Sequence, residues 1–483
     1  MSLSQLPFEI LKDICSYLDS QDEREYADHG HPALCALALT CRRVSDVAVA
    51  LLYANIELTF NSRDAKDIER VNFLNRSFQE NPSLVDRIQS ARTGLSYSEA
   101  LGANDEFHGH LARSTLLTTL RSDLHRSWTA LQALYGYRDG SFPQLRDLAI
   151  GLHHVGGKEG YLPAEQVARL CELPSLEKLT MYAPVGGFVT KSGPITTMLP
   201  GLKHLHFYHS RPVSVAVLES ILPRAPNLKC LELSVPGEAT ENNRMMTNSS
   251  SMLGFDLDEP LRPAFLGKLI APAAASLSNL TIDTVNVLFP SHDGSRIDLS
   301  GFTNLSRLEL SASLVFDTGK TAASCAWSAE FRRCLPPRIE KLHLLFDNDQ
   351  GVFWSLGDMR AHARAKTFGE LWQRRMDANY VEWLLDFLSR KHEDASSLKT
   401  VTISEDPVID RDQNWKIVQW HMTDRLKDAA SAAGVELIIK LRVPRMFESA
   451  DFEVEEESWD WGGEGTVSYD DDEELEREID EEN

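Results

Sequence analysis

The feature that most constrains the fold is a six-residue phrase with apolar residues at positions one, four and six. It reads LRDLAI at 145–150, and further copies start at residues 176, 202, 228, 277, 305, 339 and 398. The intervals between successive starts are 31, 26, 26, 49, 28, 34 and 59 residues. Positions four and six lie on the same face of an extended chain, because successive side chains of a strand alternate. Each copy therefore predicts one short strand with one buried face.

Amphipathic stretches lie between the copies and complete a repeating unit. PAEQVARLCEL precedes the second copy, VSVAVLESIL the fourth and YVEWLLDFLSRK the last. Their apolar residues recur at helical spacing, and a Pro, Ser or Asn before most phrases marks the turn from helix to strand. Such a unit cannot bury both of its apolar sides alone. Stacking the units in register is expected to give a parallel sheet on one face and helices on the other.

This pattern resembles a leucine-rich-repeat horseshoe. The predicted class is α/β, with an irregular leucine-rich-repeat-like solenoid over residues 136–445 and its parallel sheet on the concave face. About eight repeats are recognisable between residues 140 and 405, and VELIIKL (435–441) is expected as the last strand. The family places Asn or Cys at position nine of the repeat, whereas this chain has His153, Pro184 and Ser210 there. Irregular curvature is expected for that reason.

The segment before the repeats, 59–135, is predicted as a helical connector or as first irregular repeats. KDIERVNFLNRSFQ (66–79) and HLARSTLLTTLRSDLHRSWTALQALYG (110–136) are expected as helices, the second ending at its glycine. Two stretches between later copies of the phrase do not fit the repeating unit. Residues 237–252 are polar and predict a loop, and residues 359–377 are basic and predict an inserted helix.

The strong negative charge belongs mostly to the end of the chain. The formal charge is −23, but residues 446–483 contain 18 acidic side chains against one basic one, which leaves −6 for the other 445 residues. Such a run predicts a disordered acidic tail. The aromatic residues Phe452, Trp459, Trp461 and Tyr469 leave open a second interpretation, in which the tail anchors on a basic partner or on 359–377.

Composition excludes several classes of protein. No run approaches the roughly 18 apolar residues that a membrane span requires, and Glu9, Lys12 and Asp13 interrupt the N-terminal stretch that could be mistaken for a secretory signal. The seven cysteines are scattered without a CxxC pair, so a disulfide framework and a zinc ribbon are not expected. We expect a cytoplasmic and/or nuclear protein with no membrane or nucleic-acid partner.

The N-terminus carries a short helix that is too apolar for its length. LPFEILKDICSYL (6–18) places apolar side chains at every fourth residue, and PALCALALTCRRVSDVAVALLY (32–53) follows after a polar interval. Together, residues 4–55 resemble an F-box, and a three-helix F-box is predicted over 1–58. Two features depart from the family: a longer interval after the first helix, and Val44 where an aromatic residue is common.

The resemblance implies docking on a Skp-type adaptor and, through it, on a cullin-RING scaffold. Three short helices also expose more apolar area than about fifty residues can hide, which fits a partner groove. Packing of the stripe on the chain's own 60–135 segment is the alternative. The adaptor-binding residues that the resemblance implies are Leu6, Pro7, Ile10, Leu11, Ile14, Tyr17, Leu18, Leu37, Leu39, Cys41 and Val44.

No constellation for catalysis is found in the sequence. VGGFVTKSG (185–193) has Thr190 where a phosphate-binding loop needs glycine, and HEDAS (392–396) has Ser396 where a zinc protease needs its second histidine. We therefore predict no catalytic residue, no cofactor and no enzyme activity.

Binding of a target protein is expected on the concave face, where positions three, five and seven of the phrase point. Tyr182, His204, His206 and Tyr208 form its most distinctive patch. The two histidines stand in a metal-ligand spacing, but no Cys or carboxylate is obviously supplied to complete a set, so no metal site is predicted. The candidate target-binding residues are Lys178, Tyr182, His204, His206, Tyr208, Glu232, Arg307, Lys341 and His343.

The resemblance to the F-box family therefore implies a non-catalytic substrate receptor of an SCF-type cullin-RING ubiquitin ligase, whereas the repeats and the charge pattern alone indicate adaptor-like helices on a binding solenoid. The main alternative is a leucine-rich-repeat scaffold without a ubiquitin-ligase role. A third reading, an acidic chaperone for basic proteins, rests on the tail alone. The sequence specifies neither the target nor whether its recognition needs phosphorylation.

Overall fold

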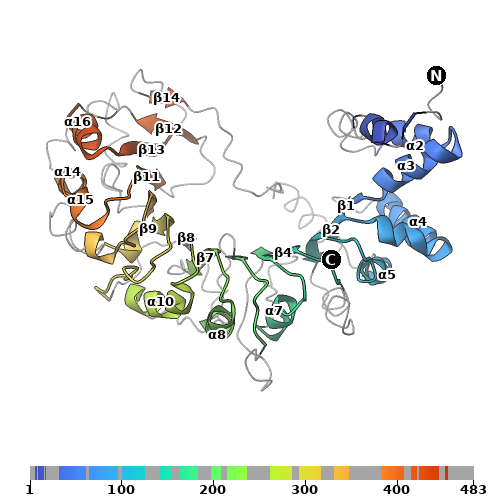
Figure 1. Cartoon of the computed structure of the whole chain (residues 1–483), viewed down its shortest axis with the longest axis horizontal. Helices are drawn as coiled ribbons and strands as arrows, with labels where there is room; N and C mark the ends of the chain where they lie inside the picture. The colour runs from blue at the N-terminus through green and yellow to red at the C-terminus, as the bar shows by residue number, and fades with distance from the viewer. Residues whose placement is uncertain are drawn as a thin grey trace, which may run out of the picture.

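The repeats form an open arc with strands along its inner side and helices outside (Figure 1). The N-terminal helices lie at one end of the arc and α16 lies at the other. The structure is a computed structural model, and it describes residues 6–7, 9–15, 17, 32–60, 65–95, 101–125, 142–153, 164–182, 197–207, 215–236, 262–285, 293–316, 331–347, 382–406, 415–420, 422, 424–444 and 452–454.

Short helices alternate with the strands along the chain. Residues 9–15 are helical, and the labelled helices are α2 (Pro32–Ala38), α3 (Arg42–Leu52), α4 (Ala65–Glu80), α5 (Leu101–Leu111), α7 (Ala164–Cys171), α8 (Val215–Ile221), α10 (Pro263–Ile270), α14 (Glu382–Ser389), α15 (Lys391–Asp394) and α16 (Asp424–Ala433). In the described part of the chain, four 3-10 turns accompany them: η2 (Pro82–Arg87), η4 (Leu222–Arg224), η6 (Ala271–Ala273) and η7 (Ala312–Leu314).

The strands of the described residues make one sheet of 14 strands. They are β1 (Asn55–Phe60), β2 (Ser90–Leu95), β3 (Thr119–His125), β4 (Asp147–His153), β5 (Lys178–Tyr182), β6 (His204–Phe207), β7 (Cys230–Pro236), β8 (Asn279–Val285), β9 (Arg307–Ser311), β10 (Lys341–Asp347), β11 (Thr400–Asp406), β12 (Trp415–Trp420), β13 (Glu436–Pro444) and β14 (Phe452–Val454). Strands β1 to β11, followed by β13, pair in parallel, and β12 and β14 join antiparallel at the end. The predicted parallel sheet with outer helices is confirmed.

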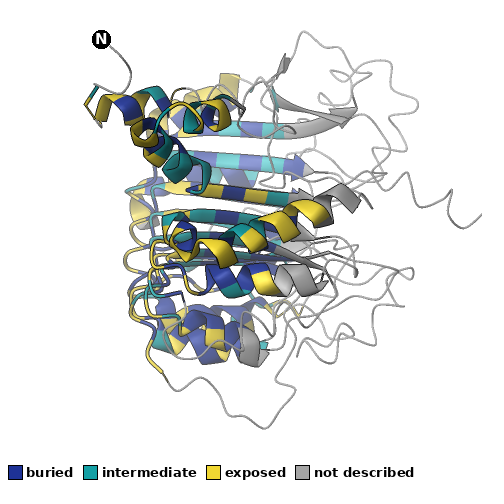
Figure 2. Ribbon diagram, turned by 90° about the vertical axis from the view of Figure 1, so that its right-hand side faces the viewer, coloured by how far each residue is buried: buried dark blue, intermediate teal, exposed yellow. Residues whose placement is uncertain are grey.

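Every copy of the phrase that the sequence revealed forms one strand, from β4 to β11. Position three of each copy pairs with position three of the next, as Asp147 does with Lys178. Positions one, four and six are buried, and in the first copy Leu145, Leu148 and Ile150 are all fully buried. Figure 2 shows the consequence, a stack of strands on which buried and more exposed residues alternate.

The sheet begins at Asn55, about eighty residues before residue 136, where the solenoid was predicted to begin. Strands β1, β2 and β3 pair in parallel with one another and with β4. The prediction of a helix over 110–136 is wrong at residues 119–125, which form β3. The alternative of first irregular repeats over 59–135 therefore holds for these strands. The phrase was not recognised in β2 and β3 because position six is polar: Thr93 and Ser122 stand where the later strands have Leu, Ile, Met or Phe.

A buried histidine explains how these polar residues are accommodated. His108 of α5 is fully buried, and its Nε2 lies 3.3 Å from Thr93 Oγ1 and 3.2 Å from Ser122 Oγ. Thr93 also donates a hydrogen bond of 2.9 Å to Ser122. The three side chains satisfy one another inside the core, so the hydroxyl groups do not incur the cost of an unpaired buried polar group.

Replacing His108 by leucine is therefore expected to destabilise the first repeats. The two buried hydroxyl groups would lose a partner, and we expect a loss of about 2–3 kcal/mol in urea unfolding. The matched control is the triple variant His108→Leu, Thr93→Val and Ser122→Ala, which removes all the polar groups together and should recover most of that loss. Equal instability of the single and triple variants would contradict this account.

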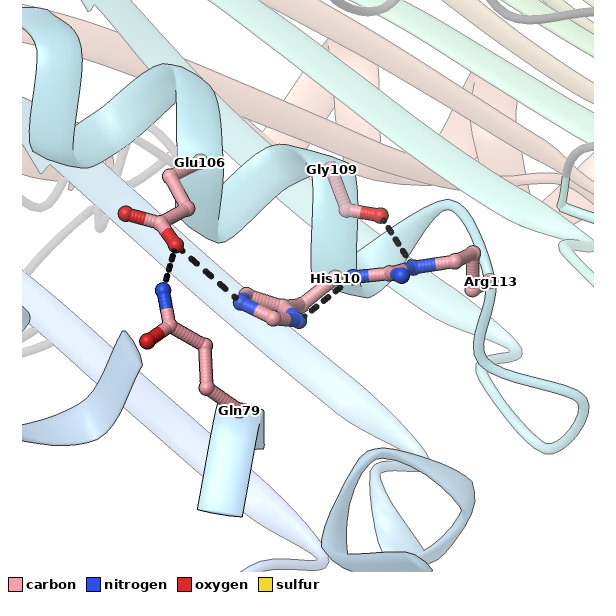
Figure 3. Close-up of polar contacts among 5 residues, drawn as sticks. All are labelled: Gln79, Glu106, Gly109, His110 and Arg113. Carbon is pink, nitrogen blue, oxygen red and sulfur yellow. Dashed lines mark hydrogen bonds and ion pairs between the residues drawn. The ribbon is translucent and has the colours of Figure 1, made fainter. Parts of the chain in front are cut away.

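A second polar network joins α4 to α5 on the outer side of the sheet (Figure 3). Gln79 of α4 donates a hydrogen bond to Glu106 of α5, whose carboxylate lies 3.8 Å from His110 Nε2. Arg113 donates to His110 Nδ1 at 2.7 Å and to the Gly109 carbonyl at 3.2 Å. Burial and the Arg113 guanidinium lower the pKa of His110, so the ring stays neutral and accepts at Nδ1.

The turns before the strands carry their own side-chain contacts. The residue just before position one donates a hydrogen bond to a carbonyl of the preceding repeat: Ser175 to Pro143 at 2.7 Å, Asn227 to Pro200 at 2.9 Å, and Asn304 to Ala275 at 2.6 Å. These contacts link successive units at the opposite end of the strand from position nine, where the family has its asparagine.

The C-terminal end of the solenoid is closed by α16 and the antiparallel strands. Gly434 has φ +61°, and the Val435 N–H bonds to the Ala430 carbonyl at 2.9 Å, which ends α16 with a left-handed turn. The buried Lys391 donates to the Ala433 carbonyl at 2.9 Å, where a cation also suits the negative end of the helix dipole.

The predicted boundary of the acidic tail needs a correction. Phe452–Val454 form β14 and pair with β12, so the sheet extends beyond residue 446, where the tail was predicted to begin. The predictions for 237–252, for 359–377 and for the acidic run after Val454 lie outside the described residues.

Candidate adaptor face and concave binding surface

The N-terminal helices have a small core of their own. Leu11, Cys15, Leu34, Val44 and Val47 are buried against one another, apart from the main core of the solenoid. Partly buried apolar residues surround this cluster: Leu6, Leu37, Cys41, Leu51 and Leu52. We call the unit built by residues 9–15, α2 and α3 the N-terminal module.

The C-terminal half of α3 ties the module to the solenoid. Val49 and Tyr53 pack against the main core, and the Tyr53 ring lies 5.9 Å from that of Phe78 in α4. Arg87 of η2 donates a hydrogen bond of 3.1 Å to the Asp46 carbonyl. Only two residues separate α3 from β1, so the module is built directly on the first repeat.

Large apolar side chains remain exposed on the module. Ile10 is 45% exposed, Tyr17 is 64% exposed and Leu39 is 89% exposed. Pro7 is exposed as well, and Leu6, Ile14, Leu37 and Cys41 are half-buried. Exposed apolar side chains that gather into one patch are typical of partner surfaces. These residues include most of those assigned to the adaptor contact from the sequence.

Two of the assigned residues have a different role. Leu11 and Val44 are each 1% exposed and lie in the core of the module, so they hold its helices together and offer no surface to a partner. The sequence stripe did not separate the two sides of the helix, because a stripe wide enough to serve a core and a partner covers more than half of its circumference. Leu18 lies outside the described residues.

Positions three, five and seven of the strands are the ones predicted to point to the concave face, and the described candidates at these positions are exposed or half-buried. Arg307 and Lys341 are exposed there. The half-buried candidates on the same face are Lys178, Tyr182, His204, His206, Glu232 and His343, and Tyr208 lies outside the described residues.

Charged side chains pair across neighbouring strands of this face. Lys178 Nζ lies 3.4 Å from Asp147 Oδ2. On the later strands, His343 Nδ1 lies 3.2 Å from Glu309 Oε2, and its Nε2 lies 2.7 Å from Ser404 Oγ. These side chains therefore contact side chains of the neighbouring strands in the absence of a partner protein.

Arg121 is a concave residue that the sequence analysis missed. Its guanidinium carbon lies 5.4 Å from the centre of the Tyr182 ring, a cation–π contact that reaches across β4 from β3 to β5. The residue was missed because its segment was predicted as helix. The phrase Leu117-x-x-Leu120 was the signal that could have placed it at position five of a strand.

The densest polar cluster lies on β6 and β7. His204 pairs in register with Cys230, and His206 pairs with Glu232. His206 Nδ1 lies 2.9 Å from Glu232 Oε2, and the two imidazole ring centres are 6.2 Å apart. The prediction that no Cys or carboxylate accompanies the two histidines is wrong, since the adjacent strand supplies one of each.

The histidines of this cluster differ in their preference for a proton. Burial, together with the nearby His206 and Lys178, lowers the pKa of His204. Burial also disfavours the charged form of His206, but hydrogen bonds with Cys230 and Glu232 outweigh it and raise the pKa of His206 to about 9. At neutral pH, His204 is therefore the neutral ring and His206 the protonated one.

Comparisons with known proteins agree with the prediction of an F-box at the N-terminus. The family model described as F-box-like matches residues 3–59, which are the N-terminal module and β1. The chain thus carries an F-box-like domain, followed by a leucine-rich-repeat-like solenoid defined by the register of its sheet. No curated protein sequence matches the chain.

Among solved structures, the chain is similar to the crystal structure of the leucine-rich repeat-containing protein LegL7 from Legionella pneumophila. The identity is 15%, the TM-score is 0.32, and the match covers 80% of this chain and 90% of that one. Among the described residues, no helix is both long enough and apolar enough to cross a membrane.

Proposed function

We propose that this chain is a non-catalytic substrate receptor of an SCF-type cullin-RING ubiquitin ligase. In this proposal the F-box-like domain binds a Skp-type adaptor, the adaptor links it to a cullin-RING scaffold, and the concave face holds a target protein. The ligase partners supply the chemistry, and the receptor contributes by bringing the target close. The protein would work in the cytoplasm and/or the nucleus.

The observation that supports this proposal best is the exposed apolar surface of the F-box-like domain. Ile10, Tyr17 and Leu39 remain open to water although the rest of the module is packed on its own core and on the first repeat. The alternative in which the whole stripe packs on 60–135 loses support, because the contacts with that segment come from α3 and leave these three side chains uncovered.

The concave face supports the target-binding half of the proposal. It combines exposed cations at Arg307 and Lys341 with the ordered cluster on β6 and β7. Histidine and tyrosine side chains lose little conformational freedom on binding, which suits them to an interface.

Co-purification with a Skp-type adaptor and a cullin tests the proposal. The intact chain should capture both, and a variant with Leu6, Pro7 and Ile10 changed to alanine should capture neither. Capture of the adaptor without a cullin would favour the alternative, a leucine-rich-repeat scaffold without a ligase role. If the intact chain fails to capture the adaptor, the proposal is wrong.

A further inference from the structure

We propose that His204, His206 and Cys230 form a binding site for a divalent metal ion of the zinc class on the concave face. This inference goes beyond the proposed function and does not depend on it. It rests on the arrangement of four side chains on two adjacent strands, and each step of that arrangement can be followed from the register of the sheet.

The geometry comes from strand pairing. His204 and His206 occupy positions three and five of β6, so both side chains project from the same face of the strand. Cys230 lies beside His204 on β7. One ligand atom from each of the three residues can be chosen so that all lie within 4.8 Å of one another.

That spacing is close to what a bound ion requires. Zinc holds nitrogen at about 2.0–2.1 Å and sulfur at about 2.3 Å, which places tetrahedral ligand atoms about 3.3–3.6 Å apart. Binding of an ion would draw these atoms closer, and all three side chains can rotate about their χ angles. All three residues are half-buried and face the open side of the sheet, so an ion has access to them.

The donor set selects the kind of metal. Two imidazole nitrogens and one thiolate suit zinc and the neighbouring late transition metals, whereas magnesium and calcium prefer oxygen ligands. Cys230 is one of the free cysteines, so its thiol is available for this role.

Glu232 fits the role of a positioning carboxylate. It lies 2.9 Å from Nδ1 of His206, so that nitrogen can keep its proton toward the carboxylate while a metal ion displaces the second ring proton and binds at Nε2. Metal-bound histidines are commonly held by a carboxylate in this way. With three protein ligands, one coordination position stays open toward the concave face, where water or a side chain of a bound protein can occupy it.

The same sheet contains a second histidine–carboxylate pair, His343 and Glu309, which has no further histidine or cysteine ligand beside it among the described residues. His343 and Glu309 occupy position five of β10 and β9 and lie 3.2 Å apart, as His206 and Glu232 do on β6 and β7. At position three, however, these strands carry Lys341 and Arg307, which repel a cation. A histidine–carboxylate pair therefore occurs twice on this face, and only one of the two has an imidazole and a thiol beside it among the described residues.

Titration of the full chain with cobalt tests the site. The protein is stripped of metal with a chelator, and Co²⁺ is added as a spectroscopic substitute for zinc. Tetrahedral coordination by a thiolate produces a sulfur-to-cobalt charge-transfer band, which zinc should then displace. We expect one ion per chain.

Cys230→Ser should abolish the band and weaken zinc binding by about 100-fold or more, and His204→Ala should weaken it similarly. Glu232→Gln should cost about 10- to 100-fold.

Two control variants separate this site from other thiols and histidines. His343→Ala removes the histidine of the second histidine–carboxylate pair, and Cys334→Ser removes a half-buried thiol elsewhere, so neither should change the band. The metal-free melting temperature of each variant establishes that it is folded. Absence of the charge-transfer band in the intact chain, or a Cys230→Ser variant that binds cobalt like the intact chain, would overturn the proposal.

Discussion

Changing Leu39 to aspartate is expected to weaken binding of a Skp-type adaptor by about 30- to 1,000-fold. Leu39 is 89% exposed just after α2, so the change removes the most exposed of the module's large apolar side chains and places a charge in the proposed contact. Central apolar residues of an interface typically contribute about 2–4 kcal/mol, which corresponds to this range of affinity. The measurement is the affinity of the purified chain for the isolated adaptor.

Leu34 of α2, five residues before Leu39, provides the matched control. It is fully buried in the core of the module, so Leu34→Ala should lower the melting temperature, whereas Leu39→Asp should leave it unchanged. Leu116→Asp, at a site on the loop before β3 that is 49% exposed, should affect neither quantity. If Leu39→Asp bound the adaptor as tightly as the intact chain, the proposed adaptor face would be misplaced.

Truncating Trp383 to alanine is expected to produce the largest loss of stability, about 3–5 kcal/mol. Trp383 is fully buried in α14, and its ring lies 5.2 Å from Phe316 and 6.4 Å from Phe346. Phe331 joins the same cluster at 5.3 Å from Phe316. The indole therefore fills the space between α14, β10 and the segment after β9.

The loss should be confined to the C-terminal repeats, because each unit of a solenoid contacts mainly its neighbours. Amide hydrogen exchange should accelerate by about 100-fold or more in α14 and β10, and little in β4 to β6. Trp383→Phe should cost much less, since a ring remains and the buried indole N–H has no hydrogen-bond partner among the described residues. Equal acceleration in β4 would show instead that the sheet unfolds as one unit.

The repeats could be predicted from the sequence wherever position six is apolar. All eight copies of the phrase are strands, because Leu, Ile or Val at spacing two both favours an extended chain and supplies its buried face. The first repeats could not be found in this way. Thr93 and Ser122 are tolerated in the core only because His108 reaches them from a helix whose place is set by the fold, and no local pattern reveals that partner.

The candidate sites, too, could be predicted from the sequence only in part, because some of their contacts depend on the tertiary structure. The apolar stripe of the first helix predicted a partner surface, but assigning Leu11 to the core and Ile10 to the exposed side required the packing of α2 and α3. His204 and His206 could be placed on the concave face from their positions in the phrase. Cys230 and Glu232 were recognised as their neighbours only from the register between β6 and β7, which lie 26 residues apart in the sequence.

The short connection between α3 and β1 determines how far the F-box-like domain lies from the middle of the concave face. Since α3 packs on the first repeat through Val49 and Tyr53 and only two residues separate it from β1, the proposed adaptor face joins the solenoid without a linker. Six strand spacings separate β1 from β7, about 30 Å along the sheet. In the proposed ligase, a target seated on β6 and β7 would stand at a fixed distance from the ubiquitin-carrying subunit. The lysine of the target that receives ubiquitin would then be selected by its position in the complex. The amino-acid sequence around that lysine would matter little.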